Sequence, residues 1–291
     1  MSPGSETLNK DPKQHLAQLL DEAKLHTTRL EEGALQWQYW PGPDDKLPLL
    51  LLHGGFGSWT HWIANLEALR QHRPLWTVDM PGLGSSGKMP KPQTVAHFCE
   101  LILDGFDSLV GADAVFDIAG FSFGALVGSH VAAKAGTRCK HFIACGAAGF
   151  GELHVQVDLL KPPNEATPEV EADSIHRSNL RCLMFARSET IDDLAVYIHA
   201  DNLAHARFNS RRLAKSDEFT KIIPQISAKL CGVWGSKDVT AGEMPGIVSR
   251  EALFRAAQPN CAFHIMDRVG HWAMYEDAEG FNRIVIEELA E

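Results

Sequence analysis

The sequence has no block of basic residues and no hydrophobic run long enough to cross a bilayer. It has 27 Lys and Arg residues and 37 Asp and Glu residues, which gives a formal net charge of −10. This negative charge argues against a nucleic-acid partner. The longest near-continuous apolar stretch, residues 47–52, is far shorter than the roughly 20 residues of a membrane span. The first six residues lack the basic and apolar parts of a secretory signal, so we expect a cytoplasmic protein.

The chain also lacks the usual patterns of disulfide frameworks, metal centres and nucleotide sites. Its six cysteines are scattered and include no C-x-x-C pair, which favours reduced core cysteines over disulfides or a metal site. No H-E-x-x-H or phosphate-binding G-x-x-x-x-G-K-[S/T] motif occurs. The glycine-containing run at 79–84 has Pro81 where a dinucleotide-binding fingerprint needs its first glycine. We therefore predict no metal and no cofactor.

What the sequence does contain is an alternation of strand-like and helix-like runs. A chain of 291 residues with 45% hydrophobic content suits one large α/β domain. The strand-like runs are residues 47–52, 75–79, 114–119, 140–145, 230–234 and 262–266, and the helix-like runs are residues 11–24, 60–71, 94–110, 125–133, 249–257 and 277–288. Such units predict a mostly parallel sheet with helices on both faces, and residues 27–40 predict a hairpin at its edge.

The alternation breaks once, near Gly151. From there to about residue 226 the chain is polar, helical in pattern and interrupted by prolines at 162, 163 and 168. This composition predicts a helical cap at 151–226 inserted into a core formed by residues 31–150 and 227–291. Residues 1–30 are predicted to form an N-terminal helical extension.

A G-x-S-x-G pentapeptide lies between one strand-like run and the helix-like run that follows it. Its residues are Gly120, Phe121, Ser122, Phe123 and Gly124. A serine at such a strand-to-helix turn is held in a strained conformation that exposes its hydroxyl, as a nucleophile requires. The competing interpretation of the pentapeptide alone is a serine that caps a helix after a glycine turn.

An acid and a base follow in the positions that a serine nucleophile needs. Asp238 comes just after the strand-like run at 230–234, and His271 comes shortly after the run at 262–266. Catalytic groups of open α/β sheets lie beyond the carboxyl ends of the strands, and the order serine, aspartate, histidine is typical of one such fold. Taken alone, Asp238 fits a loop turn and His271 a helix start; together they predict a catalytic triad with Ser122.

A hydrolytic serine also needs two donors for the oxyanion that forms on the substrate. One backbone N–H is predicted from Phe123, directly after the nucleophile. The other is predicted from Gly55, in the glycine-rich loop His53-Gly54-Gly55-Phe56-Gly57 that follows the first buried strand.

With these motifs the chain resembles the α/β-hydrolase fold superfamily from about residue 35 to its C-terminus. Within it, residues 270–276, 281–283 and 144–151 resemble the meta-cleavage-product hydrolases, which cut C–C bonds in ring-fission products of aromatic degradation. The resemblance implies an α/β-hydrolase fold with a helical cap over the site. In the resembling enzymes the cap selects the substrate, and one of six cap arginines turned inward would bind a substrate carboxylate; solvated surface positions are the alternative. These arginines are Arg177, Arg181, Arg187, Arg207, Arg211 and Arg212.

Two departures from that family change the predicted reaction. Phe121 stands where the family has a polar asparagine, and Phe56-Gly57-Ser58 stands where its glycine loop runs on through Gly-Pro. Both replacements remove polar groups that would face a dienoate substrate. We therefore predict a serine hydrolase that cleaves a carboxylic ester, thioester or lactone through an acyl-enzyme.

The expected partner is a small acyl substrate in an apolar pocket walled by Phe56, Phe121 and Trp272, although simple core packing also accounts for these aromatic residues. C–C hydrolysis is the first alternative. A non-hydrolytic ligand receptor and a cofactor-free oxygenase on the same fold are the others. The sequence leaves the oligomeric state open, a homo-oligomer included.

Overall fold

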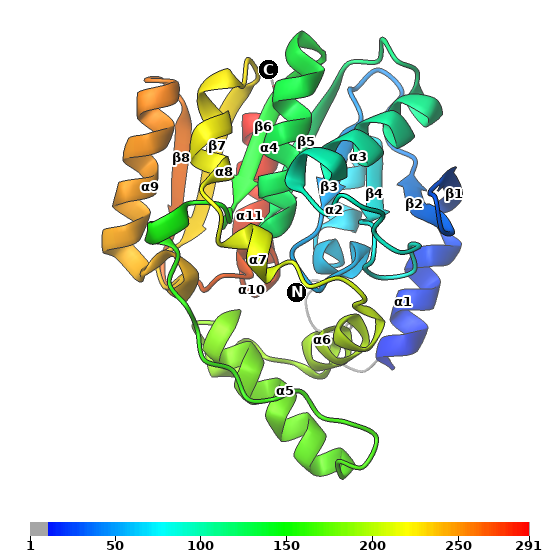
Figure 1. Ribbon diagram of the computed structural model, residues 1–291, viewed down its shortest axis with the longest axis vertical. Coiled ribbons are helices and arrows are strands. Elements are labelled where there is room, and N and C mark those ends of the chain that lie inside the picture. The colour runs from blue at the N-terminus through cyan, green and yellow to red at the C-terminus, as the bar shows by residue number, and fades with distance from the viewer. Residues whose placement is uncertain (1–10, 291) are drawn as a thin grey trace, which may run out of the picture.

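The computed structural model describes residues 11–290 and contains one eight-stranded sheet with the strand order β1-β2-β4-β3-β5-β6-β7-β8 (Figure 1). The strands β3 to β8 pair in parallel, whereas β1 and β2 are antiparallel to their neighbours. The strands are β1 (Lys24–Arg29), β2 (Ala34–Trp40), β3 (Leu49–Leu52), β4 (Leu75–Asp79), β5 (Phe116–Phe121), β6 (Cys139–Cys145), β7 (Lys229–Gly235) and β8 (Ala262–Met266). This is the predicted mostly parallel sheet with an edge hairpin.

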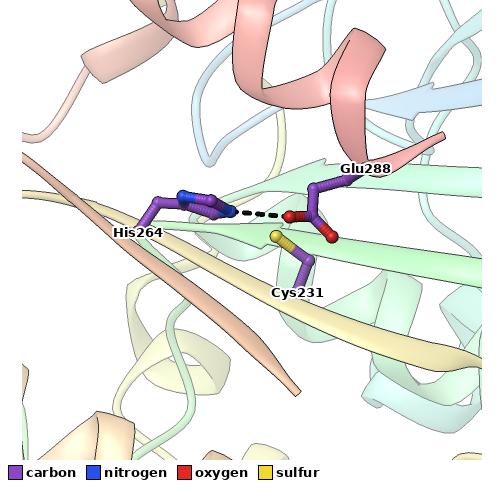
Figure 2. A group of neighbouring side chains, drawn as sticks. All are labelled: Cys231, His264 and Glu288. Carbon is purple, nitrogen blue, oxygen red and sulfur yellow. Dashed lines mark hydrogen bonds and ion pairs between the residues drawn. The ribbon is translucent and has the colours of Figure 1, made fainter. Parts of the chain in front are cut away.

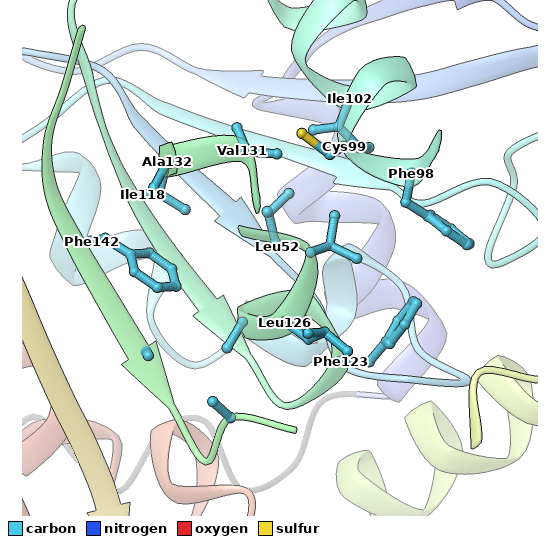
Figure 3. Close-up of a cluster of buried hydrophobic side chains, with 14 of the residues drawn as sticks. Leu52, Phe98, Cys99, Ile102, Ile118, Phe123, Leu126, Val131, Ala132 and Phe142 are labelled. Atoms are coloured by element: carbon cyan, nitrogen blue, oxygen red, sulfur yellow. The ribbon is translucent and has the colours of Figure 1, made fainter. Parts of the chain in front are cut away.

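Helices cover both faces of the sheet. They are α1 (Pro12–Asp21), α2 (Leu66–Arg70), α3 (Val95–Val110), α4 (Phe123–Ala135), α5 (Glu169–Leu183), α6 (Asp193–His205), α7 (Arg211–Ala214), α8 (Glu218–Ile222), α9 (Glu243–Ala257), α10 (Ala273–Glu276) and α11 (Ala278–Glu288). All four residues of β3 are fully buried because the strand is covered on both sides. Leu52 packs with side chains of α3 and α4 (Figure 3), and Leu50 belongs to the same cluster. Leu49 and Leu51 belong to the cluster on the other face, with side chains of α2 and α11.

Most predicted elements are confirmed, but three bounds were wrong. The helix predicted at 60–71 is a short 3-10 helix, Trp59–Trp62, followed by α2. Buried Asn65 separates the two and donates 2.8 Å hydrogen bonds to the Met274 carbonyl and Asn282 Oδ1. Helix α9 begins at Glu243 instead of residue 249. The prediction began too late because Pro245 and Gly246 are untypical of helices, although proline is tolerated in a first turn.

The third correction concerns the predicted N-terminal helical extension at residues 1–30, in which the helix was predicted at residues 11–24. Helix α1 ends at Asp21, and residues 24–29 form β1, which pairs with β2 along its length. Residues 1–10 of the predicted extension lie outside the described residues. The part of the chain from 11 to 290 contains no helix that is both long and apolar enough to cross a membrane.

The segment between β6 and β7 carries the helices α5 to α8, as the break in alternation predicts. Figure 1 shows α5 and α6 beyond the carboxyl ends of the parallel strands, on the side where the strand-end loops meet. Apart from a short 3-10 helix at Gly151–Leu153, residues 151–168 have no regular structure. The segment therefore lies where it can cover the strand-end loops.

Candidate active site

Ser122 occupies a strained turn between β5 and α4. Its φ of 53° and ψ of −113° lie in a region that favours glycine. A Cβ at Gly120 would lie 2.6 Å from Ala125 Cα, and one at Gly124 would lie 2.3 Å from the Leu52 carbonyl oxygen. Ser122 stands at the N-cap position of α4 but makes no capping hydrogen bond through its side chain. The helix-cap interpretation is therefore wrong, and the hydroxyl is available for chemistry.

The side chains of the three residues predicted to form a triad are hydrogen-bonded one to the next. His271 Nε2 is 3.0 Å from Ser122 Oγ, and His271 Nδ1 is 2.8 Å from Asp238 Oδ2. The other carboxylate oxygen, Oδ1, accepts hydrogen bonds from the Thr240 backbone N–H at 2.9 Å and from the Thr240 hydroxyl at 2.7 Å. This arrangement can remove a proton from the serine hydroxyl and stabilise the imidazolium that results.

Asp238 is fully buried, yet it is held in its ionised form. Burial alone would raise its pKa, but the charge of His271 and the hydrogen bonds from His271 and Thr240 outweigh burial and lower the pKa. An ionised carboxylate beside Nδ1 favours the tautomer that leaves Nε2 free to accept the serine proton.

Sequence reasoning missed two residues that shape this arrangement. Gly146, with φ of 51°, follows β6, and a Cβ there would lie 3.1 Å from His271 Nδ1 and 3.3 Å from Asp238 Oδ2. Thr240 holds the far side of the Asp238 carboxylate. The only sequence signal for Thr240 is its place two residues after the acid, whereas Gly146 reveals its role only once β6 and β7 are side by side.

The two predicted oxyanion donors come from neighbouring backbones. A Cβ at Gly55 would lie 3.6 Å from Phe123 Cβ. Phe123 is the first residue of α4, so its N–H has no partner inside the helix and lies at the positive end of the helix dipole. Both features suit the stabilisation of a negative charge near Ser122.

A cavity opens beside Ser122 and His271 under the segment between β6 and β7. Its apolar lining includes Phe56, Phe121, Phe123, Val155, Val157, Leu159, Leu160, Leu183, Met184 and Leu203. Its polar lining includes His61, His154, Gln156, Asn179, His199, Asn202, Ser210, Arg211, Lys215 and Thr240. The predicted apolar pocket is therefore apolar on part of its wall only.

Of the three predicted pocket aromatics, Phe56 and Phe121 line this cavity and Trp272 does not. Trp272 is a core residue: its indole N–H donates to the His61 carbonyl at 2.9 Å and its ring packs on Tyr275. The core-packing interpretation thus applies to Trp272, because the chain turns into α10 directly after it and carries the ring inward.

Among the six cap arginines, Arg211 lines the cavity, and its guanidinium lies 5.4 Å from the centre of the Phe56 ring. Arg187 is instead bound to Glu276, and Arg177 pairs with Asp173. The alternative interpretation thus applies to Arg187 and Arg177, which are paired outside the cavity. Arg211 is a predicted cap arginine that lines the cavity.

One group of metal-ligand side chains occurs within residues 11–290, and it lies away from the cavity. The ligand atoms of Cys231, His264 and Glu288 lie within 4.8 Å of one another (Figure 2). His264 Nε2 already bonds Glu288 Oε1 at 2.8 Å, and burial raises the pKa of the Cys231 thiol, which opposes the thiolate that a metal requires. That the protein needs no metal stays a prediction. All six cysteines are free, and Cys182 is exposed while the others are buried.

We expect the free energy of unfolding to fall as the pH drops from 6.5 towards 4. Burial lowers the pKa of both His53 and His199 to about 4, so the unfolded chain takes up protons that the folded chain refuses. Each histidine then costs on the order of 3 kcal/mol by pH 4. Asp79 partly offsets this loss, because burial raises its pKa to about 6 and its protonation favours the folded state.

Urea unfolding at pH 7 and pH 4.5 measures this difference. His199→Gln should reduce the pH dependence, since it removes one of the buried neutral histidines, whereas His205→Gln, at an exposed position, should leave it unchanged. Equal stability of the wild-type chain at the two pH values would contradict the assignment of buried neutral histidines.

Comparisons with known proteins place the chain in a family. A model of the alpha/beta hydrolase family matches residues 49–284, and the chain belongs to this family. It is 33% identical over 261 residues to a dihydrolipoyllysine-residue acetyltransferase component of an acetoin cleaving system from Pseudomonas putida. That match covers 83% of this chain and 63% of the relative, so the chain spans less than two thirds of the relative's length.

Two further matches cover nearly the whole of both chains. A 2-hydroxy-6-oxononadienedioate/2-hydroxy-6-oxononatrienedioate hydrolase from Pseudomonas putida is 24% identical over 282 residues, covering 90% of this chain and 94% of the relative. The crystal structure of a naproxen esterase (carboxylesterase NP) from Bacillus subtilis superposes with a TM-score of 0.72 at 17% identity, covering 95% and 96% of the two chains. The family match and the hydrolase relative support a hydrolase, and the superposition supports the fold; they do not choose between C–C and ester cleavage.

Proposed function

We propose that the protein is a serine hydrolase that cleaves a carboxylic ester, thioester or lactone through an acyl-enzyme. The observation that carries the proposal is the hydrogen-bonded series from Ser122 through His271 to the buried Asp238. The cavity beside Ser122 supports a small acyl substrate. No cofactor enters the proposed reaction.

The proposed reaction has two steps. Ser122 Oγ attacks the substrate carbonyl while His271 Nε2 accepts its proton, and the backbone N–H groups of Gly55 and Phe123 bind the oxyanion. His271 then protonates the leaving group, which departs and leaves the acyl group on Ser122. In the second step His271 activates a water molecule that releases the acid.

The side chains around Ser122 favour ester cleavage over C–C cleavage. Phe121 is fully buried with its ring between His61 and His271, at centroid distances of 5.4 Å and 4.9 Å. This apolar ring offers no hydrogen bond to a dienoate intermediate, whereas acyl transfer needs only the triad and the two oxyanion donors. C–C hydrolysis is the second candidate, because the relatives that match over most of their length include hydrolases of ring-fission products.

We propose that residues 151–226 form a cap that selects the substrate, inserted into a core of residues 31–150 and 227–291. The cap supplies much of the cavity lining, from its irregular first part to α5, α6 and α7. Its contribution is mixed, because Leu159 and Leu160 are apolar while Arg211 and Lys215 carry positive charge. A substrate with an apolar acyl group and a polar end fits such a lining.

A substrate panel tests the reaction. We expect kcat/KM for p-nitrophenyl acetate or butyrate to exceed that for a 2-hydroxy-6-oxo-dienoate by about 100-fold or more, because Phe121 replaces a polar group that the latter substrate needs. Initial rates measured by release of p-nitrophenol and by loss of dienoate absorbance give both constants. A higher kcat/KM for the dienoate would replace ester cleavage by C–C cleavage.

A further inference from the structure

His61 lines the catalytic cavity but belongs to neither the triad nor the predicted oxyanion donors. It lies in the 3-10 helix Trp59–Trp62, which follows the glycine-rich loop at residues 53–57, here called the oxyanion loop. Its side chain is buried, and its ring meets the edges of Phe121 and Trp272 at centroid distances of 5.4 Å and 5.1 Å. A polar ring in this position needs a physical explanation.

The His61 ring accepts a hydrogen bond from the oxyanion loop. The Gly54 backbone N–H donates to His61 Nδ1 at 3.1 Å. Because a backbone N–H can only donate, Nδ1 is the acceptor and the proton of the neutral ring is on Nε2. Burial and the neighbouring histidines lower the pKa of His61 well below its usual value, so the ring stays neutral.

The direction of the Gly55 N–H depends on how the Gly54 peptide group is held. The Gly54 carbonyl accepts a 2.8 Å hydrogen bond from His53 Nδ1, whose own Nε2 accepts from the Met80 N–H at 2.9 Å. The Gly54 carbonyl and the Gly55 N–H belong to one peptide plane and point in opposite directions in a trans peptide. His53 and His61 therefore hold Gly54 on both sides and set the direction of the next N–H.

The loop is also wrapped closely around the His61 ring. A Cβ at Gly57 would lie 2.2 Å from His61 Cε1 and 2.4 Å from Nδ1, so only glycine fits there. On the opposite side, the Trp272 indole N–H donates to the His61 carbonyl at 2.9 Å. His61 thus contacts the oxyanion loop, the residue before Ser122 and the residue after His271.

The remaining ring nitrogen, His61 Nε2, is not sealed off in the core. Within residues 11–290 it has no hydrogen-bond partner, yet it is not among the fully buried nitrogens without a partner, such as Nε1 of Trp62 and Trp234, and His61 itself lines the cavity. Its N–H is therefore available to a polar oxygen of the substrate.

We propose that His61 is a positioning residue: its Nδ1 holds the oxyanion loop so that the Gly55 N–H faces the oxygen of the carbonyl group that Ser122 attacks. Its Nε2–H offers one neutral donor to the substrate, which favours an acyl substrate with a carbonyl or hydroxyl oxygen near the scissile bond. The proposal rests on the proposed hydrolase function.

Two variants separate the two nitrogens. In His61→Asn the side-chain oxygen takes the place of Nδ1 and still accepts from Gly54, but the donor to the cavity is lost. In His61→Gln the amide N–H takes the place of Nε2, but the acceptor for Gly54 is lost. We expect kcat to fall by about 100-fold in His61→Gln, the size of the loss of one oxyanion donor. In His61→Asn we expect kcat to stay within about tenfold of wild type and KM to rise.

Thermal unfolding of both variants controls for stability, and the comparison is made on the best ester of the panel. Equal losses of kcat in the two variants at equal unfolding temperatures, or wild-type kcat in His61→Gln, would overturn the positioning role. If wild type cleaves no ester, the proposed function fails, and the ring tautomer then tests the contact by itself. Nitrogen-15 NMR at pH 7 should place the proton of His61 on Nε2, and a proton on Nδ1 would refute the contact with Gly54.

Discussion

Ser122→Ala is expected to lower kcat for ester cleavage by about 10⁴-fold or more, because it removes the hydroxyl that is hydrogen-bonded to His271 Nε2 and would form the acyl-enzyme. His271 is 3.0 Å from the serine hydroxyl, so the variant loses both the nucleophile and the proton that the base accepts. The oxyanion donors stay in place and leave a residual rate above that of water alone. Steady-state kinetics with a p-nitrophenyl ester at pH 7 to 8 measures the loss.

A second serine in the following helix provides a matched control. Ser129 lies in α4, is buried and donates only to the Leu126 carbonyl at 2.7 Å. Ser129→Ala should keep kcat within about threefold, since a lost intrahelical hydrogen bond of about 1 kcal/mol changes stability and leaves the site intact. If Ser122→Ala retained most of the wild-type activity, the nucleophile would have to be another residue.

Asp238→Asn should also cost about 10⁴-fold in kcat, with little change in shape. Thr240 donates to Oδ1 through both its backbone N–H and its hydroxyl, so the oxygen of the new amide stays on that side. The amide nitrogen then faces His271 Nδ1, and because it can only donate, Nδ1 becomes the acceptor. The imidazole proton moves to Nε2, and the base can no longer accept from Ser122.

The control for this variant is Asp267→Asn, since Asp267 follows β8 and its side chain is 85% exposed. It should leave kcat unchanged. Raising the pH tests the tautomer argument, because a wrong tautomer is not corrected by deprotonation. Restoration of wild-type kcat in Asp238→Asn at high pH would mean that Asp238 acts on the protonation of His271 and not on its orientation.

The contact among Ser122, Asp238 and His271 could be predicted from sequence because each of these residues follows a recognisable strand. Parallel strands bring their carboxyl ends to one edge of the sheet, so Ser122 after β5, Asp238 after β7 and His271 after β8 had to lie close together. The glycines on either side of Ser122 marked the turn for the same local reason, since the backbones there pass too closely for a side chain.

Residues whose roles depend on contacts between distant segments could not be predicted in this way. His61 acquires its position from Gly54, Phe121 and Trp272 together, and its own surroundings in the sequence resembled an ordinary helix. The prediction that Trp272 lines the pocket was wrong for the opposite reason. Its place next to His271 in the sequence suggested a pocket position, whereas the local turn carries its ring into the core. Packing direction, which single-sequence patterns do not encode, decided both cases.

The most direct test of the central claim is covalent labelling of Ser122 by a fluorophosphonate, followed by mass spectrometry of the intact chain and of its peptides. An activated serine beside a base reacts, whereas a ligand receptor with an inert serine does not. An enzyme that uses only the His–Asp pair with oxygen would lose no activity when Ser122 is blocked. We expect one adduct per chain, on Ser122, with loss of esterase activity in step with labelling and no adduct in Ser122→Ala. An unlabelled Ser122, or full activity in the labelled protein, would contradict it.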